Sequence, residues 1–162
     1  MRFALVASLT VLVASSAIAH PNDAHPPAAV TSMVAAAARP AAAVVDGFHA
    51  ALRRGDTKAA LGALADNALI FESGGAERSK AEYASHHLSA DSAFSQAVAS
   101  EVTRRTGEAA GNVAWIATEG RTRGSYKGKP IDEVTTETMV LRRAGRGWKI
   151  VHIHWSSAKG GK

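Results

Sequence analysis

The chain has 162 residues, 46% of them hydrophobic, and its 19 basic and 14 acidic residues give a formal net charge of +5. It has no cysteine, which excludes disulfides, thiolate chemistry and cysteine-containing zinc sites. The basic residues come as short pairs among acidic ones and form no basic block, so we expect no nucleic-acid partner.

The N-terminus has the pattern of a secretory signal peptide. Arg2 precedes an apolar run (residues 3–18), and Ala17 and Ala19 occupy the small-residue positions of an A-x-A cleavage site. The run is shorter than the roughly 20 residues of a comfortable membrane span. We therefore expect cleavage after Ala19 and a secreted or periplasmic protein with no membrane partner.

The mature chain is expected to start with a proline- and alanine-rich lead-in (residues 20–39) that is too poor in large apolar groups to order itself. His20 would then be the first residue, and its amine and ring nitrogens are ligand types that suit copper. We favour an untethered tail over such a metal site. The sequence therefore leaves metal binding by His20 open.

Local signals next predict two helices. Pro40 suits a first helical turn, apolar residues follow at helical spacing, and Gly55 is placed to end the segment. Asp56 or Thr57 is placed to cap the second helix.

A short strand, "ALIFES", then ends at the glycine pair 74–75. Ser79 and Glu82 match a capping box, which predicts a third helix. At successive i, i+4 steps this helix carries Tyr83, His87 and Asp91.

The remainder of the chain is rich in β-forming residues. Glycine-containing turns separate four strand-like segments, 100–109, 112–126, 131–144 and 147–157. Helices followed by consecutive strands predict an α+β domain with N-terminal helices packed on one face of an antiparallel sheet.

Two stretches carry a family resemblance. "DGFHAALRRGDTKAALGALADNALIFESGG" resembles the opening of SnoaL-like domains in the nuclear transport factor 2-like superfamily, and "TTETMVLRRAGRGWKIVHIHWSS" resembles their closing hairpin. The hairpin is also similar to that of the calcium/calmodulin-dependent protein kinase II association domain. The resemblance implies a cystatin-like, cone-shaped α+β fold over residues 40–157, followed by a flexible tail at 158–162.

The resemblance also implies a pocket face. Three arginines line the association domain's pocket at positions held here by Ala117, Met139 and Trp155, so we expect an apolar pocket instead of one for carboxylates. The predicted lining is Glu72, Tyr83, His87, Trp115, Glu119, Glu137, Met139 and Trp155. His152 and His154 then face the opposite side, where many superfamily members pair, and we expect them in a homodimer interface.

The H-x-H spacing of His152 and His154 also permits a metal site or direct catalysis. Zinc needs at least three protein ligands, and nothing in the sequence positions a third from His86, His87 or Glu72. We favour an interface in which each ring finds a hydrogen-bond partner. We predict no metal and no cofactor.

Function divides into three hypotheses. We place first a module that binds a small, largely apolar molecule in the cone. The alternative is an isomerase, dehydratase or hydrolase in which Glu72 or His87 acts as general base, with His87 oriented by Asp91. A ligand-free assembly domain is the third.

Glu72 and Glu137 could each have a structural role instead of a functional one. Glu72 is also placed to pair with Arg78. Glu137 is also placed to pair with Arg121 or Arg123 across the sheet.

Overall fold

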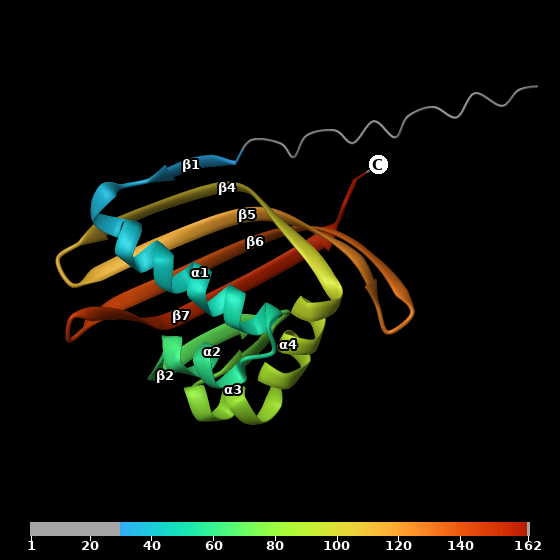
Figure 1. Ribbon diagram of the computed structural model, residues 1–162, viewed down its shortest axis with the longest axis horizontal. Coiled ribbons are helices and arrows are strands. Elements are labelled where there is room, and N and C mark those ends of the chain that lie inside the picture. Colours follow the sequence, from blue (N-terminus) through green and yellow to red (C-terminus); the bar gives the residue numbers. More distant parts are fainter. Residues whose placement is uncertain (1–29, 162) are drawn as a thin grey trace, which may run out of the picture.

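The computed structural model describes residues 30–161 as a curved seven-stranded sheet with helices packed on one face (Figure 1). The strand order is β1-β4-β5-β6-β7-β2-β3. The strands are β1 (Thr31–Val34), β2 (Leu64–Glu72), β3 (Gly75–Glu77), β4 (Val98–Ala110), β5 (Val113–Tyr126), β6 (Lys129–Ala144) and β7 (Gly147–Lys159). The helices are η1 (Ala36–Ala38), α1 (Arg39–Arg53), α2 (Thr57–Ala63), α3 (Lys80–His86) and α4 (Leu88–Ala97). The predicted α+β architecture is confirmed.

The first helix begins and ends, and the second helix begins, where the local signals predict. Pro40 lies in the first turn of α1, and Gly55 follows the helix with a φ of +73°, which glycine adopts at little cost. The Asp56 carboxylate accepts the Ala59 N–H at 2.9 Å and caps α2.

The third predicted helix is divided in two. Ser79 Oγ accepts the Glu82 N–H at 3.0 Å, as the capping box predicts, but α3 ends at His86 and α4 begins at Leu88. Beyond the break, Leu88 is buried and the Ser92 hydroxyl donates to the Leu52 carbonyl at 3.2 Å. Packing of α4 against α1 thus overrides the continuous helical stripe.

Part of the predicted disordered lead-in is ordered. Residues 31–34 form β1, which pairs in parallel with the edge of β4, and the Ala35 N–H donates to the Gly107 carbonyl at 2.9 Å. Composition misses this order because a strand edge elsewhere in the chain supplies the hydrogen bonds. Likewise, β7 extends to Lys159, into the predicted tail, where it pairs with Glu133. The predicted signal peptide (residues 1–19) lies outside the described residues.

The core lies between the concave face of the sheet and α1, which crosses in front of the central strands in Figure 1. From α1 it takes Ala41, Val45, Phe48 and Leu52, and from the sheet Ile70, Ile116, Met139, Leu141, Ile150 and Ile153. Among residues 30–161, no helix is long and apolar enough to cross a bilayer.

Candidate functional site

A polar row crosses the concave face from β4 to β2. Cross-strand partners in register share a face, and successive pairings run along β4, β5, β6, β7 and β2. The members of this row are Arg105, Thr118, Glu137, Trp155 and Glu72. The row lies immediately beside the apolar rows of the core.

Glu137 occupies the middle of the polar row and is only 9% exposed. Its Oε2 lies 2.7 Å from His49 Nε2 and accepts the Trp155 indole N–H at 2.8 Å, while Phe48 stacks on Trp155. Burial by itself raises the pKa of Glu137, but the hydrogen bond and charge of His49, the Trp155 N–H and the Arg105 charge together hold it below its ordinary value. Glu137 therefore anchors α1 on the sheet as a buried carboxylate.

The predicted pairing of Glu137 with Arg121 or Arg123 is wrong. Arg121 instead makes two hydrogen bonds to Asp132, at 2.6 and 2.7 Å. Thr118 is the β5 residue opposite Glu137, so the odd-numbered arginines of that strand lie on the other face.

The same register corrects the predicted pocket lining. Trp115 pairs with Val140 and Glu119 with Thr136, on the face opposite Glu137 and Trp155. Side chains alternate between the two faces of a strand, so an error of one residue in the phase assumed for β5 assigned its side chains to the wrong face. Ala117, aligned above with a pocket arginine, also lies on the opposite face.

Of the remaining strand residues, Met139 and Trp155 do lie on the concave side. Met139 is fully buried in the core, and Trp155 packs against the core under Phe48. Neither lines one of the two cavities described below.

An acidic pocket of about 350 Å³ lies where the β2–β3 hairpin meets the junction of α3 and α4. It is lined by Glu72, Ser73, Gly75, Glu77 and His87. Glu72 is exposed at its mouth, whereas Glu77 is 5% exposed and forms an ion pair with His87 Nδ1. Behind the pocket, the Tyr83 hydroxyl donates to Asp91 Oδ2 at 2.8 Å.

The structure thus brings together Glu72 and His87, the two sequence-predicted catalytic candidates, but changes their partners. His87 pairs with Glu77 instead of Asp91, whose carboxylate accepts the Tyr83 hydroxyl. Glu72 forms no ion pair with Arg78 among the described residues.

Glu77 is the pocket residue that sequence reasoning missed. The glycine pair at 74–75 was a signal for it, because a tight turn there predicts a returning strand. The pairing of Ile70 with Glu77 places that carboxylate on the same face as Glu72.

Loss of water and neighbouring carboxylates shift the pKa values of the acidic groups in and behind the pocket. Partial loss of water around its carboxylate raises the pKa of Glu72, and the negative charges of Asp91 and Glu77 raise it further, against a lowering effect of His87. Removal of water likewise raises the pKa of Asp91, partly offset by its hydrogen bond from Tyr83. Burial and the neighbouring carboxylates also raise the pKa of Tyr83. The tyrosine therefore stays a neutral donor.

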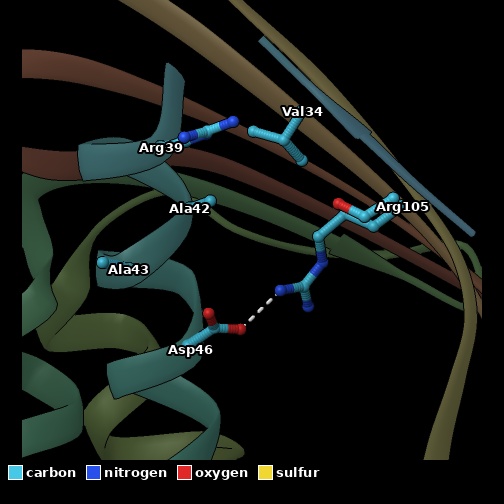
Figure 2. Close-up of a pocket in the computed structure, with 7 residues that line it drawn as sticks. Val34, Arg39, Ala42, Ala43, Asp46 and Arg105 are labelled. Atoms are coloured by element: carbon cyan, nitrogen blue, oxygen red, sulfur yellow. Dashed lines mark hydrogen bonds and ion pairs between the residues drawn. The ribbon is translucent and has the colours of Figure 1, made fainter. Parts of the chain in front are cut away.

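A basic cavity of about 500 Å³ lies at the opposite edge of the sheet, between β1, β4 and the first half of α1 (Figure 2). Its lining is Ser32, Val34, Arg39, Ala42, Ala43, Asp46 and Arg105. Arg105 reaches from β4 to pair with Asp46, and its Nε donates to Thr118 Oγ1 at 3.2 Å.

His152 and His154 lie on the outer face, opposite Glu137, as predicted. Phe71 contacts both rings edge-on, with centroids 5.3 and 6.3 Å away, and His152 Nδ1 lies 2.9 Å from the Leu69 carbonyl oxygen. Within the described part of the chain, no three histidine or carboxylate side chains are arranged to hold a metal ion.

Comparison with solved structures identifies the class of fold. A nuclear transport factor 2-like protein with a cystatin-like fold from Novosphingobium aromaticivorans is 15% identical, with a TM-score of 0.63 over 77% of this chain and 84% of that one. The calcium/calmodulin-dependent protein kinase II hub of S. rosetta is 21% identical, with a TM-score of 0.63 over 76% and 98%. The chain therefore has the nuclear transport factor 2-like, cystatin-like fold.

Sequence similarity narrows the class to a family. Residues 41–159 match the SnoaL-like domain, and the chain belongs to that family. A "putative ketosteroid isomerase" of Shewanella frigidimarina NCIMB 400 is 38% identical, with a TM-score of 0.72 over 76% of this chain and 99% of that one. A comparison with functionally curated proteins finds no match.

Proposed function

We propose that this protein is an acid–base enzyme of the isomerase or dehydratase type, with Glu72 as its general base. The observation that carries the proposal is the convergence of Glu72 and the paired His87 in one pocket, with the pKa of Glu72 raised by loss of water and by neighbouring carboxylates. A carboxylate with a raised pKa is a stronger base once ionised. The similarity to a protein named as an isomerase supports the same class of reaction.

The proposed chemistry uses proton transfers and, for a dehydration, the cleavage of one carbon–oxygen bond. Glu72 takes a carbon-bound proton next to a carbonyl group, and the electron pair moves into an enolate. In an isomerisation the proton returns at a different carbon. In a dehydration, the enolate electron pair forms a carbon–carbon double bond as the bond to a hydroxyl on the next carbon breaks. His87 gives that hydroxyl a proton so that it leaves as water, while Glu77 holds the imidazole in place.

A generic proton-abstraction probe tests this proposal without knowledge of the natural substrate. 5-Nitrobenzisoxazole opens to a coloured cyanophenolate when a base removes its carbon-bound proton. We expect saturable turnover that rises with pH as Glu72 ionises, and a loss of about 100-fold or more in Glu72→Gln, the lower end of general-base effects. Glu82→Gln, at an acid outside the pocket, is the matched control. Equal rates for Glu72→Gln and wild type would remove Glu72 as the base.

A module that binds a largely apolar molecule is less well supported. Both cavities are lined by charged side chains, and the apolar residues of the concave face are packed under α1. Native mass spectrometry tests this hypothesis, because a retained apolar molecule would restore it.

We also propose that the protein forms a homodimer through the outer face of the sheet. Phe71 and Trp115 are 37% and 38% exposed there. Phe71 contacts the rings of His152 and His154, and Trp115 continues the same face through the cross-strand row Trp115–Val140–His152, so the exposed groups form one patch that favours contact with a second copy. His154→Ala should weaken the dimer about 5-fold, as measured by sedimentation equilibrium. A full-strength dimer in that variant would count against this interface.

We propose, from the signal-peptide pattern of residues 1–19, that the protein is exported. We expect the intact mass of protein from the periplasm or medium to correspond to a chain that begins at His20. A mass that retains residues 1–19 would overturn it.

A further inference from the structure

The basic cavity contains more positive than negative charge. Its lining has two guanidinium groups, those of Arg39 and Arg105, and one carboxylate, that of Asp46. Asp46 pairs with Arg105, while Arg39 forms no ion pair with any residue in the described range. The lining therefore carries a net positive charge, and Arg39 supplies the part of it that no ion pair within residues 30–161 neutralises.

The guanidinium of Arg105 is held in one orientation by its neighbours. Its side chain is 13% exposed, and Thr118 and Asp46 engage its Nε and Nη1, which fixes the plane of the guanidinium. Nη2 has no hydrogen-bond partner among residues 30–161. A planar guanidinium of low exposure and fixed orientation is well suited to bind an oxyanion.

Small side chains keep the cavity open. Ser32, Ala42 and Ala43 leave a space of about 500 Å³, and Val34 supplies an apolar wall. Figure 2 shows Arg105 extending from its strand toward α1 and Arg39 extending from the start of α1 toward Val34. The volume lies within the range of small-molecule sites.

We propose that this cavity binds a small organic anion, whose carboxylate or phosphate group lies between Arg39 and Arg105 and whose apolar part contacts Val34. Asp46 has two roles in this site, because it orients Arg105 and competes with the ligand for the guanidinium. Its own side chain is 62% exposed, so a bound anion can share Arg105 with it. The site lies at the sheet edge opposite Glu72, and its test is independent of the proposed enzymatic function.

Isothermal titration calorimetry of the full-length mature protein tests the proposal with benzoate, inorganic phosphate and benzylammonium. We expect saturable binding of at least one anion and none of the cation. Tighter binding of benzoate would identify a carboxylate with an apolar part, and tighter binding of phosphate would identify a phosphorylated ligand. Failure of both anions to saturate would overturn the proposal.

Three variants locate the site. Arg39→Gln should weaken anion binding about 10-fold, the typical effect of one charged hydrogen bond. Asp46→Asn should strengthen it several-fold, because it removes the competitor while keeping a hydrogen-bond partner for Arg105. Arg54→Gln is the matched control, since Arg54 is exposed at the far end of α1, about 20 Å along the helix.

The variants also separate site binding from a general charge effect. Equal weakening by Arg39→Gln and Arg54→Gln would show that only the net charge of the protein attracts the anion. Weaker binding in Asp46→Asn would show that Asp46 is not a competitor. Either result would overturn the assignment of this cavity.

Discussion

The acidic pocket and the basic cavity lie at opposite edges of the same sheet and distribute charge in opposite ways. At the β2–β3 edge, Glu72 shares its surroundings with Glu77 and Asp91, so partial loss of water and, after it, like charges raise its pKa. At the β1–β4 edge, opposite charges meet, and Asp46 holds Arg105 in place. We propose that the first arrangement makes Glu72 a base and that the second lets the cavity bind an anion.

The two regions are joined by the polar row, whose centre is Glu137. Glu137→Ala should lower the free energy of unfolding by about 3 kcal/mol, because it leaves His49 and the Trp155 N–H without their buried partner. Urea denaturation measures this loss. Glu119→Ala, at an exposed carboxylate on the opposite face, should change stability by less than about 0.5 kcal/mol. Equal effects in the two variants would show that the row does not anchor α1.

Low pH should weaken the contacts of Glu137 with His49 and Trp155 in the wild type. The pKa of Glu137 is held below its ordinary value of 4.5, so the folded state favours the ionised form. Its contribution to stability is therefore fully present above pH 4.5 and is lost as the pH falls through the lowered pKa. Urea denaturation at a series of pH values should show a smaller acid-dependent loss in Glu137→Ala than in the wild type.

Substitution of Glu77 tests whether its ion pair with His87 contributes to activity in the acidic pocket. Glu77→Gln keeps the shape but removes the charge that faces His87, and we expect kcat with the proton-abstraction probe to fall about 10-fold while KM stays nearly constant. Glu77→Asp should restore part of the loss. A change confined to KM would instead indicate a role in binding.

The smallest effect concerns the titration of Glu72 itself. Among the neighbouring charges, that of Asp91 raises the pKa of Glu72 the most, so Asp91→Asn should lower that pKa toward its ordinary value. The amide oxygen can still accept the Tyr83 hydroxyl. Carbon NMR titration of the glutamate side chains measures the shift, and Asp46→Asn, in the other cavity, should leave it unchanged. An unaltered titration in Asp91→Asn would show that loss of water alone sets the pKa.

The sequence by itself determined the elements and much of their order. Gly55, Asp56 and Ser79 mark helix ends through bonds and backbone angles within a few residues, and the structure retains all three signals. The closing hairpin was recognisable because its strand residues and its turn are consecutive in the chain. The convergence of Glu72 and His87 also followed, once the third helix was placed above the first strand.

Tertiary structure alone decided which side chains share a face and which charges pair. Trp115 and Glu119 were assigned to the pocket on a phase that only the register between β5 and β6 determines. His87 was assigned to Asp91 on a helix that packing divides, and Glu77 reaches His87 from a strand on the other side of a turn. Side-chain alternation is a local property, but its absolute phase depends on hydrogen bonds to distant strands. The chemistry of the two cavities therefore follows from contacts between residues far apart in the chain.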